Sequence, residues 1–134
     1  MQYTVVMYTG KQDGAGTDGD VYLTLFGENG SSPRTCLDND GDDRESGDKD
    51  TYAMDAKDLG ELSQCYVEVN GDGWFLEKIV VSDTNGSTWT FPCGRWLAKD
   101  EDDHRTERWL PAKNNNVASR AFAKRTAKAN IFKP

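Results

Sequence analysis

The sequence predicts an all-β protein, an antiparallel β-sandwich of seven or eight strands. Short stretches of strand-like composition recur along the chain, separated by turns rich in glycine, aspartate, asparagine and serine. No apolar pattern of helical period and useful length appears before residue 117. A chain of 134 residues and 14.9 kDa has room for one hydrophobic core. These observations favour a single β domain.

The alternation is clearest in two segments. VYLTLF at residues 21–26 places an aliphatic side chain at every second position, and CYVEV at residues 65–69 follows the same rule with a cysteine and two valines. Such alternation is typical of antiparallel strands with one buried face. Strands are therefore expected over residues 3–8, 21–26, 34–37, 51–56, 65–69, 75–81, 88–91 and 108–110.

The charge is unevenly distributed. The formal net charge is −7, yet residues 117–134 carry five basic residues and no acidic one. An acidic body repels phosphate, so nucleic acid is not expected as a partner. The chain is expected to divide into a body, residues 1–112, and a short basic tail or linker, residues 113–134, either helical or disordered.

Targeting and redox signals are few. No run approaches the ~18 apolar residues of a membrane span, and the N-terminal residues lack the basic start and apolar stretch of a signal peptide. The compartment is therefore left open. The three cysteines, Cys36, Cys65 and Cys93, form no CxxC pair. This argues against a zinc or redox motif and predicts three free thiols.

Carboxylates are concentrated in residues 38–50, DNDGDDRESGDKD. Two interpretations are open: a solvated, disordered loop, or a loop that a hard cation orders by collecting the carboxylates. An EF-hand is excluded, because a loop counted from Asp38 has Asp43 where glycine is required and Lys49 where glutamate is required.

Calcium accepts backbone carbonyls as well as carboxylates, and glycine lets a loop turn its carbonyls towards an ion. Two further loops combine aspartate or asparagine with glycine, namely DGAGTDGD at residues 13–20 and NGDG at residues 70–73. Three such loops in one small β domain indicate calcium binding at one end of the sandwich.

Several motifs together resemble the PLAT family, named for polycystin, lipoxygenase and clostridial alpha-toxin, and especially the repeats of its hair-cell tandem-PLAT member. They are YTV at 3–5, GAGTD at 14–18, VYLTLFG at 21–27, DN at 38–39, DKDTY at 48–52 and GDGWFLEKI at 71–79. The resemblance extends over residues 3–111. It implies an eight-stranded antiparallel sandwich with lipoxygenase homology. It also implies a non-catalytic module that docks onto a membrane surface or a partner protein, often with calcium.

The resemblance further implies a calcium-ligand set for one to three ions. Gly14 stands where calcium-binding members can carry aspartate, so whether one of up to three sites is complete is left undecided. Asp18 and Asp43 are the expected bridging carboxylates. The implied ligands are Gly14, Gly16, Thr17, Asp18, Asp38, Asn39, Gly41, Asp42, Asp43, Asp72 and Gly73.

Two aromatic residues, Trp74 and Phe75, follow the GDG loop directly. They are candidate contacts with a membrane or a partner, because an indole ring suits the boundary between polar and apolar phases. The alternative is that Trp74 packs over the end of the core. Trp89, Trp96 and Trp109 are expected in the core or in edge packing.

Catalysis is not expected. His104, the only histidine, lies in the charged segment KDEDDHRTER, and the chain has no GxSxG elbow, Cys–His pairing with a plausible frame, or phosphate-binding glycine loop in a strand–helix context. Two alternatives to calcium-dependent docking are a calcium-independent protein–protein interaction module within a larger chain and a small hydrolase that uses the acids. The isolated domain is expected to be monomeric.

Overall fold

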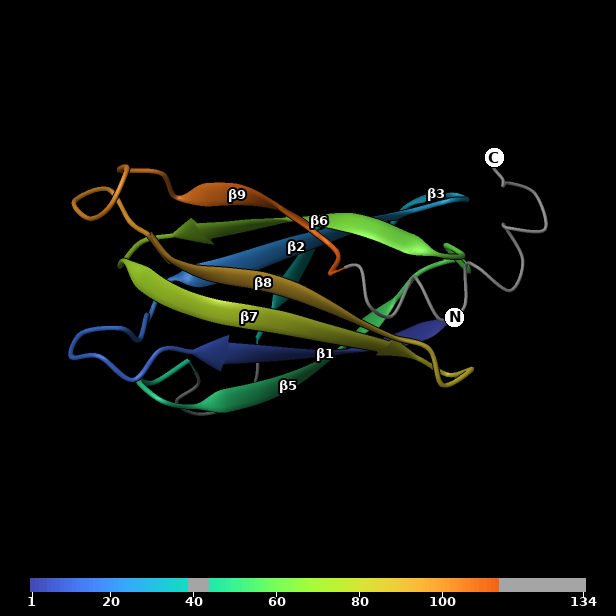
Figure 1. The fold of residues 1–134 in the computed structure, drawn as a ribbon, viewed down its shortest axis with the longest axis horizontal. Coiled ribbons are helices and arrows are strands. Elements are labelled where there is room, and N and C mark those ends of the chain that lie inside the picture. Colours follow the sequence, from blue (N-terminus) through green and yellow to red (C-terminus); the bar gives the residue numbers. More distant parts are fainter. Residues whose placement is uncertain (39–43, 114–134) are drawn as a thin grey trace.

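A computed structural model describes residues 1–38 and 44–113, which form two antiparallel sheets packed face to face (Figure 1). The all-β sandwich is thus confirmed. These residues form nine strands, one more than expected, because the Gly30–Ser31 pair is too short for an alternating pattern to mark it. The strands are β1 (Gln2–Thr9), β2 (Asp20–Gly27), β3 (Gly30–Ser31), β4 (Thr35–Leu37), β5 (Lys49–Asp55), β6 (Leu62–Asn70), β7 (Trp74–Asp83), β8 (Thr88–Leu97) and β9 (Glu107–Pro111).

The two sheets differ in strand order. One has the order β5-β1-β7-β8, so β1 lies between two strands that come much later in the chain. The other has the order β3-β2-β6-β9, and β4 also pairs with β2. β8 and β9 are therefore the last strands of their respective sheets, a position that leaves one edge of each without a partner in its own sheet.

The core fills the space between the sheets. In β2 the residues Val21, Leu23 and Leu25 are completely buried, as the alternating pattern predicts. Trp74 and Trp89 are the largest side chains of the core. Burying one large apolar side chain contributes roughly 1.5–3 kcal/mol. The sandwich is thus held by the apolar contacts between its inner faces.

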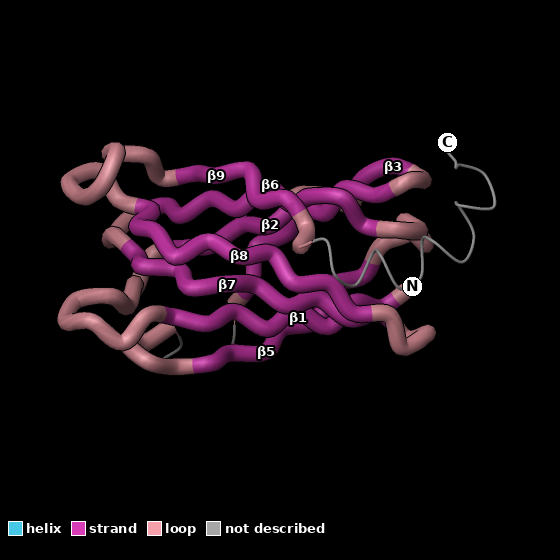
Figure 2. Tube along the Cα trace, viewed as in Figure 1, coloured by secondary structure: helices cyan, strands magenta, loops and turns pink. Residues whose placement is uncertain are grey.

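Four connections lie together at one end of the sandwich, at the left of Figures 1 and 2. They are the β1–β2 loop (residues 10–19), the end of the β4–β5 connection next to β5 (residues 44–48), the β6–β7 turn (residues 71–73) and the β8–β9 loop (residues 98–106). The N-terminus lies at the opposite end (Figure 1). We call these four connections the loop end; all three acidic glycine loops singled out in the sequence contribute to it.

Three further expectations concern the basic tail, the cysteines and membrane-spanning segments. Apart from Lys113, the basic tail lies outside the described residues. All three cysteines are free thiols, as expected: Cys36 is exposed, Cys65 is buried and Cys93 is half-buried. Within residues 1–38 and 44–113, no helix has the length and apolar character that a membrane crossing requires.

Ion pairs order the β8–β9 loop. Nη2 of Arg108 lies 2.7 Å from Oδ1 of Asp103 and also donates to the carbonyl of Trp96 at 2.7 Å. Nη2 of Arg95 lies 2.8 Å from Oδ1 of Asp102. The hydrogen bond from Arg108 lowers the pKa of Asp103 to about 2. Ionised Asp103 therefore contributes to the ion pairs that hold the loop.

Replacing Asp103 with asparagine is expected to flatten the acid side of the stability profile. A carboxylate whose pKa is lower in the folded than in the unfolded state, where it is about 3.9, stabilises the fold above that unfolded value. The contribution disappears as the pH falls towards the folded pKa. Melting temperatures between about pH 4 and pH 2 should therefore decrease less steeply in Asp103→Asn than in the parent.

Asp55→Asn, at an exposed position of β5, serves as the control for simple loss of a negative charge. If Asp103→Asn and the parent lost stability with the same slope, the ion pair with Arg108 would not contribute to folding.

Candidate functional site

The GAGTD segment is anchored to the β6–β7 turn. The Thr17 hydroxyl donates to the carbonyl of Asp72 at 2.7 Å and accepts from the amide of Gly19 at 3.0 Å. The amide of Phe75 donates to the carbonyl of Ala15 at 2.9 Å. Ala15 and Thr17 are buried, whereas Asp18 is exposed. These anchors bring Asp18 and Asp72, which are far apart in the sequence, to the same place.

The segment that leads into β5 closes on the GAGTD loop from the other side. The amide of Thr17 donates to the carbonyl of Arg44 at 3.0 Å, and the amide of Gly47 donates to the carbonyl of Gly10 at 2.8 Å. A Cβ atom at Gly16 would lie 2.6 Å from the carbonyl oxygen of Arg44. Only glycine permits this approach of the two backbones, which explains a glycine at the centre of the motif.

A hollow of about 220 Å³ lies where the three loops meet. In the described parts of the chain, the carboxylates of Asp18, Glu45 and Asp72 form no hydrogen bond or ion pair. A second hollow alongside shares Asp18 and Asp72. Oxygen donors without thiols or imidazoles suit a hard cation such as calcium. The residues that line the first hollow are Gly14, Gly16, Thr17, Asp18, Glu45, Ser46 and Asp72.

Arg44 is a buried cation beneath these loops, with 4% of its surface exposed. Its Nη1 donates to the carbonyl of Leu37 at 3.0 Å and to the hydroxyl of Tyr52 at 2.8 Å. Its Nη2 donates to the carbonyl of Gly19 at 3.1 Å. One side chain thus ties the end of β4, strand β5 and the β1–β2 loop together.

Three residues of this site were not predicted from the sequence. Arg44, Glu45 and Ser46 lie in a run of charged and polar residues that reads as a solvated loop. No feature of the sequence distinguished Arg44 from an exposed arginine. Glu45 and Ser46 follow a denser run of aspartates, and nothing in their own positions marks them as part of a site.

The expected ligands are only partly within the described residues. Gly14, Gly16, Thr17, Asp18 and Asp72 come together, as described above. Gly73 lines a further hollow with Asp72, and Asp38 is exposed just after β4. Among residues 1–38 and 44–113, no three acidic, histidine or cysteine side chains are close enough together to hold a metal ion by themselves. The remaining expected ligands, which lie outside the described residues, are Asn39, Gly41, Asp42 and Asp43.

The candidate surface contact at Trp74 is wrong. Its side chain is completely buried, and its indole Nε1 donates to the hydroxyl of Thr9 at 2.9 Å. Trp74 therefore packs in the core, the alternative that the sequence left open. Phe75 is half-buried and meets the ring of Trp96 edge-on at 5.5 Å.

The aromatic surface lies elsewhere, on the outer face of the β2-β6-β9 sheet. Trp109 is 54% exposed, and its ring centroid lies 4.6 Å from that of Tyr66 and 5.1 Å from that of Phe26. The sequence predicted edge or core packing for Trp109. Its position on the last strand of the sheet fits the edge, while its exposure could not be derived from the alternation within β9 alone.

Comparison with known proteins identifies relatives over most of the chain. The model of the family described as PLAT/LH2 domain matches residues 3–111. Lipoxygenase homology domain-containing protein 1 of Mus musculus is 43% identical over 112 residues, which are 80% of this chain and 5% of the relative. The allene oxide synthase-lipoxygenase protein of Plexaura homomalla is 31% identical over 107 residues, which are 73% of this chain and 10% of the relative. The chain thus spans about a twentieth to a tenth of these relatives.

Solved structures share the fold. Coral 8R-lipoxygenase, whose description names calcium activation via a C2-like domain, superimposes with a TM-score of 0.74 at 24% identity, over 84% of this chain and 17% of that one. A calcium-dependent 11R-lipoxygenase superimposes with a TM-score of 0.66 at 25% identity, over 97% of this chain and 21% of that one. The matched part is a small fraction of each lipoxygenase.

The small matched fraction shows which part of the lipoxygenases this chain corresponds to. The lipoxygenase relatives are enzymes several times longer than this chain, which corresponds only to their PLAT portion. That portion is a non-catalytic module. With a family model that covers residues 3–111, and a sandwich whose motifs lie at one end, the chain belongs to the PLAT/LH2 domain family.

Proposed function

We propose that this PLAT domain binds calcium at its loop end and docks through those loops onto a membrane surface or a partner protein. The observation that carries the proposal is the hollow at which three loops meet. On its walls lie the carboxylates of Asp18, Glu45 and Asp72, which have no partner among residues 1–38 and 44–113.

The residues present suit calcium better than any softer ion. Calcium takes six to eight oxygen ligands, and backbone carbonyl oxygens can fill the coordination positions that carboxylates do not. Asp18, Glu45 and Asp72 offer carboxylates, and Gly14 and Gly16 offer backbone carbonyls at the same hollow. One to three ions are proposed. The set is completed by the ligands expected from the family resemblance: Thr17, Asp38, Asn39, Gly41, Asp42, Asp43 and Gly73.

Two structural relatives support this reading. The descriptions of coral 8R-lipoxygenase and of the 11R-lipoxygenase name calcium activation and calcium dependence for those proteins. Their shared fold with this chain supports calcium as the ion of the proposal.

Calcium would also change how the loop end meets a surface. The chain is acidic, with a net charge of −7, and so repels an anionic membrane in the absence of an ion. A divalent cation neutralises the carboxylates at the loop end and removes the repulsion between them. Docking would therefore require the ion.

Calcium is expected to raise the melting temperature of the metal-stripped chain. A ligand that binds only the folded state stabilises it by about 2.7 kcal/mol at a free concentration 100 times its dissociation constant. Magnesium should stabilise less, because it requires a smaller octahedral shell. Asp18→Asn and Asp72→Asn should lose most of the calcium effect, and the charge-matched control Asp55→Asn, at an exposed position of β5, should keep it.

Melting curves that coincide in chelator and in millimolar calcium would contradict the proposal. Docking is checked separately by sedimentation with phosphatidylserine vesicles, in calcium and in chelator. Binding in calcium alone supports the membrane as the docking surface. Calcium-dependent stabilisation without vesicle binding would favour a partner protein.

A second candidate function, calcium-independent protein interaction within a larger chain, is favoured by two observations. Arg44 links segments of the loop end through its own hydrogen bonds, and Trp109 exposes an aromatic surface away from that end. Stability and partner binding that are unaffected by chelator would select this candidate over the first.

A further inference from the structure

Two of the three thiols lie near the side of the sandwich where β8 and β9 are the last strands of their sheets. Cys65 is completely buried on β6, and Cys93 of β8 is half-buried and packs against the hydrophobic core. Trp89 and Phe91 of β8 are buried, and the alternation along a strand places Cys93 on the same inner face. The two thiols therefore project from opposite sheets towards the same interior.

The backbone places the two cysteines at a similar level along the sandwich. β6 and β8 both end at the loop end, and Cα atoms of the two strands come within 8 Å of each other. The amide of Ala112 donates to the carbonyl of Ser63 on β6 at 2.9 Å, and the amide of Lys113 donates to the carbonyl of Thr90 on β8 at 2.7 Å. Each cysteine follows the anchored residue of its own strand by a few positions, in the same direction.

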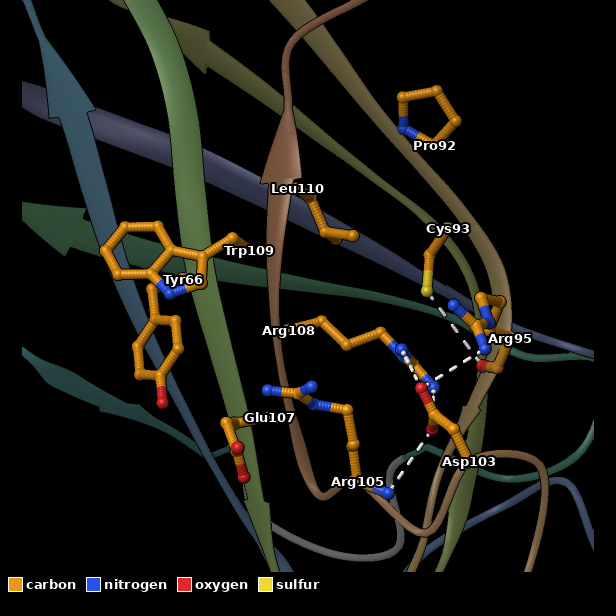
Figure 3. A pocket seen from close by; sticks show the side chains of 10 residues that line it. All are labelled: Tyr66, Pro92, Cys93, Arg95, Asp103, Arg105, Glu107, Arg108, Trp109 and Leu110. Atoms are coloured by element: carbon orange, nitrogen blue, oxygen red, sulfur yellow. Dashed lines mark hydrogen bonds and ion pairs between the residues drawn. The ribbon is translucent and has the colours of Figure 1, made fainter.

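Leu110 of β9 is a neighbour of both cysteines. It is the register partner of Cys65, and together with Cys93 it lines a hollow of about 380 Å³ between β8 and β9. Figure 3 shows Leu110 and Cys93 projecting into the space between these two strands. Burial raises the pKa of the Cys65 thiol, and a negative charge on Cys93 raises it further. Because a charge acts strongly only on nearby groups, the two sulfur atoms are neighbours across the core.

The strand that carries Cys93 can adjust its backbone locally. The pairing of β8 with β7 shifts register between Leu76 and Lys78, and Gly94, next to Cys93, adopts a positive φ of 65°. Such a bulge interrupts the regular ladder, and β8 is the last strand of its sheet. A disulfide requires Cα atoms about 4.4–6.8 Å apart. A bulge on a last strand permits a small shift towards that distance.

We propose that Cys65 and Cys93 form a disulfide that joins the two sheets when the chain meets a disulfide oxidant such as oxidised glutathione. The bond adds a covalent link on the side where the amide of Ala98 already donates to the carbonyl of Arg105 and the amide of Lys113 donates to the carbonyl of Thr90. This link is independent of calcium at the loop end.

The exposure of the two thiols sets the order of the steps. The thiolate of Cys93 attacks one sulfur of oxidised glutathione, which forms a mixed disulfide and releases one glutathione thiolate. The thiolate of Cys65 then attacks the sulfur of Cys93 and releases the second glutathione thiolate. The protons lost by the two cysteines protonate the two glutathione molecules. Two protein thiols are thus oxidised to one disulfide, and one glutathione disulfide is reduced to two thiols.

The test uses the full chain with Cys36→Ser, which removes the exposed thiol and leaves the proposed pair. The chain is equilibrated with mixtures of reduced and oxidised glutathione, from both the reduced and the linked form. The pH is mildly alkaline, because burial raises the pKa of the Cys93 thiol. N-ethylmaleimide then blocks the remaining thiols. Intact mass distinguishes the blocked chain, the glutathione adduct and the linked monomer, which has lost only its two thiol hydrogens.

The native chain is expected to link under more reducing conditions than the same chain unfolded in urea. The squared concentration of reduced glutathione, divided by that of oxidised glutathione, should be about tenfold higher at the native midpoint. The reason is that the fold holds the sulfur atoms closer together than a flexible linker does. By thermodynamic linkage the bond should raise the melting temperature by about 4 °C.

A matched control moves one thiol to the other face of β8. Pro92 is exposed, so Pro92→Cys combined with Cys93→Ser places the thiol one residue earlier but pointing away from the core. This folded variant should link less readily than its unfolded form. The proposal would be overturned if the native chain linked no more readily than the unfolded one, if glutathione remained on Cys93 without linkage, or if the moved thiol linked as readily as Cys93.

Discussion

Replacing Trp74 with alanine is expected to lower the free energy of unfolding by about 3–5 kcal/mol. The side chain is completely buried among the core residues, and its indole N–H satisfies the hydroxyl of Thr9. The substitution leaves a cavity and removes the hydrogen bond to that buried hydroxyl. Urea unfolding followed by far-ultraviolet circular dichroism measures the loss.

Trp109→Ala is the matched control, because it makes the same change at an exposed position. Trp109 is 54% exposed and contacts Tyr66 and Phe26 only on the outer face of the sheet. Its loss should cost about 1 kcal/mol, the contribution of an aromatic pair. Equal destabilisation by the two substitutions would contradict the assignment of Trp74 to the core and Trp109 to the surface.

Arg44→Met is expected to have the second largest effect, a loss of about 3 kcal/mol. Methionine fills much of the volume but donates no hydrogen bond, so the carbonyls of Leu37 and Gly19 lose a buried donor. The loss should be concentrated at the loop end. Hydrogen exchange at the amide of Thr17, which donates to the carbonyl of Arg44, should accelerate beyond the change in global stability.

Arg34→Met removes an arginine of the opposite kind, half-exposed and paired with Glu68 at 2.9 Å on the outer face. Pairs of this type contribute about 0–1 kcal/mol. If Arg34→Met and Arg44→Met destabilised the chain equally, the buried hydrogen bonds of Arg44 would not determine the order of the loop end.

The fold could be predicted because the dominant signal is local. The alternation in residues 21–26 reappears as a strand with three buried aliphatic residues. Alternation also marked residues 65–69, and strand-like composition between turns located the other strands longer than two residues. Neither signal marked Gly30–Ser31, because two residues show no period.

The candidate site was only partly predictable because it depends on contacts between distant segments. The glycine and aspartate motifs indicated which loops to consider, and Asp18 and Asp72 do meet. The burial of Arg44 arises from carbonyls of residues 19 and 37 that only the folded chain brings together. Trp74 was ambiguous for the same reason, since its partner Thr9 lies 65 residues earlier in the sequence.

The central place of β1 in its sheet has a consequence for the order of folding. Val5 of β1 pairs with Tyr52 on one side and with Val81 on the other. Because β1 is synthesised before both of its neighbours, it cannot complete its hydrogen bonds until β7, which ends at Asp83, has been synthesised. Sheets built from such distant pairs fold over milliseconds to seconds rather than microseconds. During that interval the nascent chain carries a hydrophobic strand with two unpaired edges, which makes it vulnerable to aggregation.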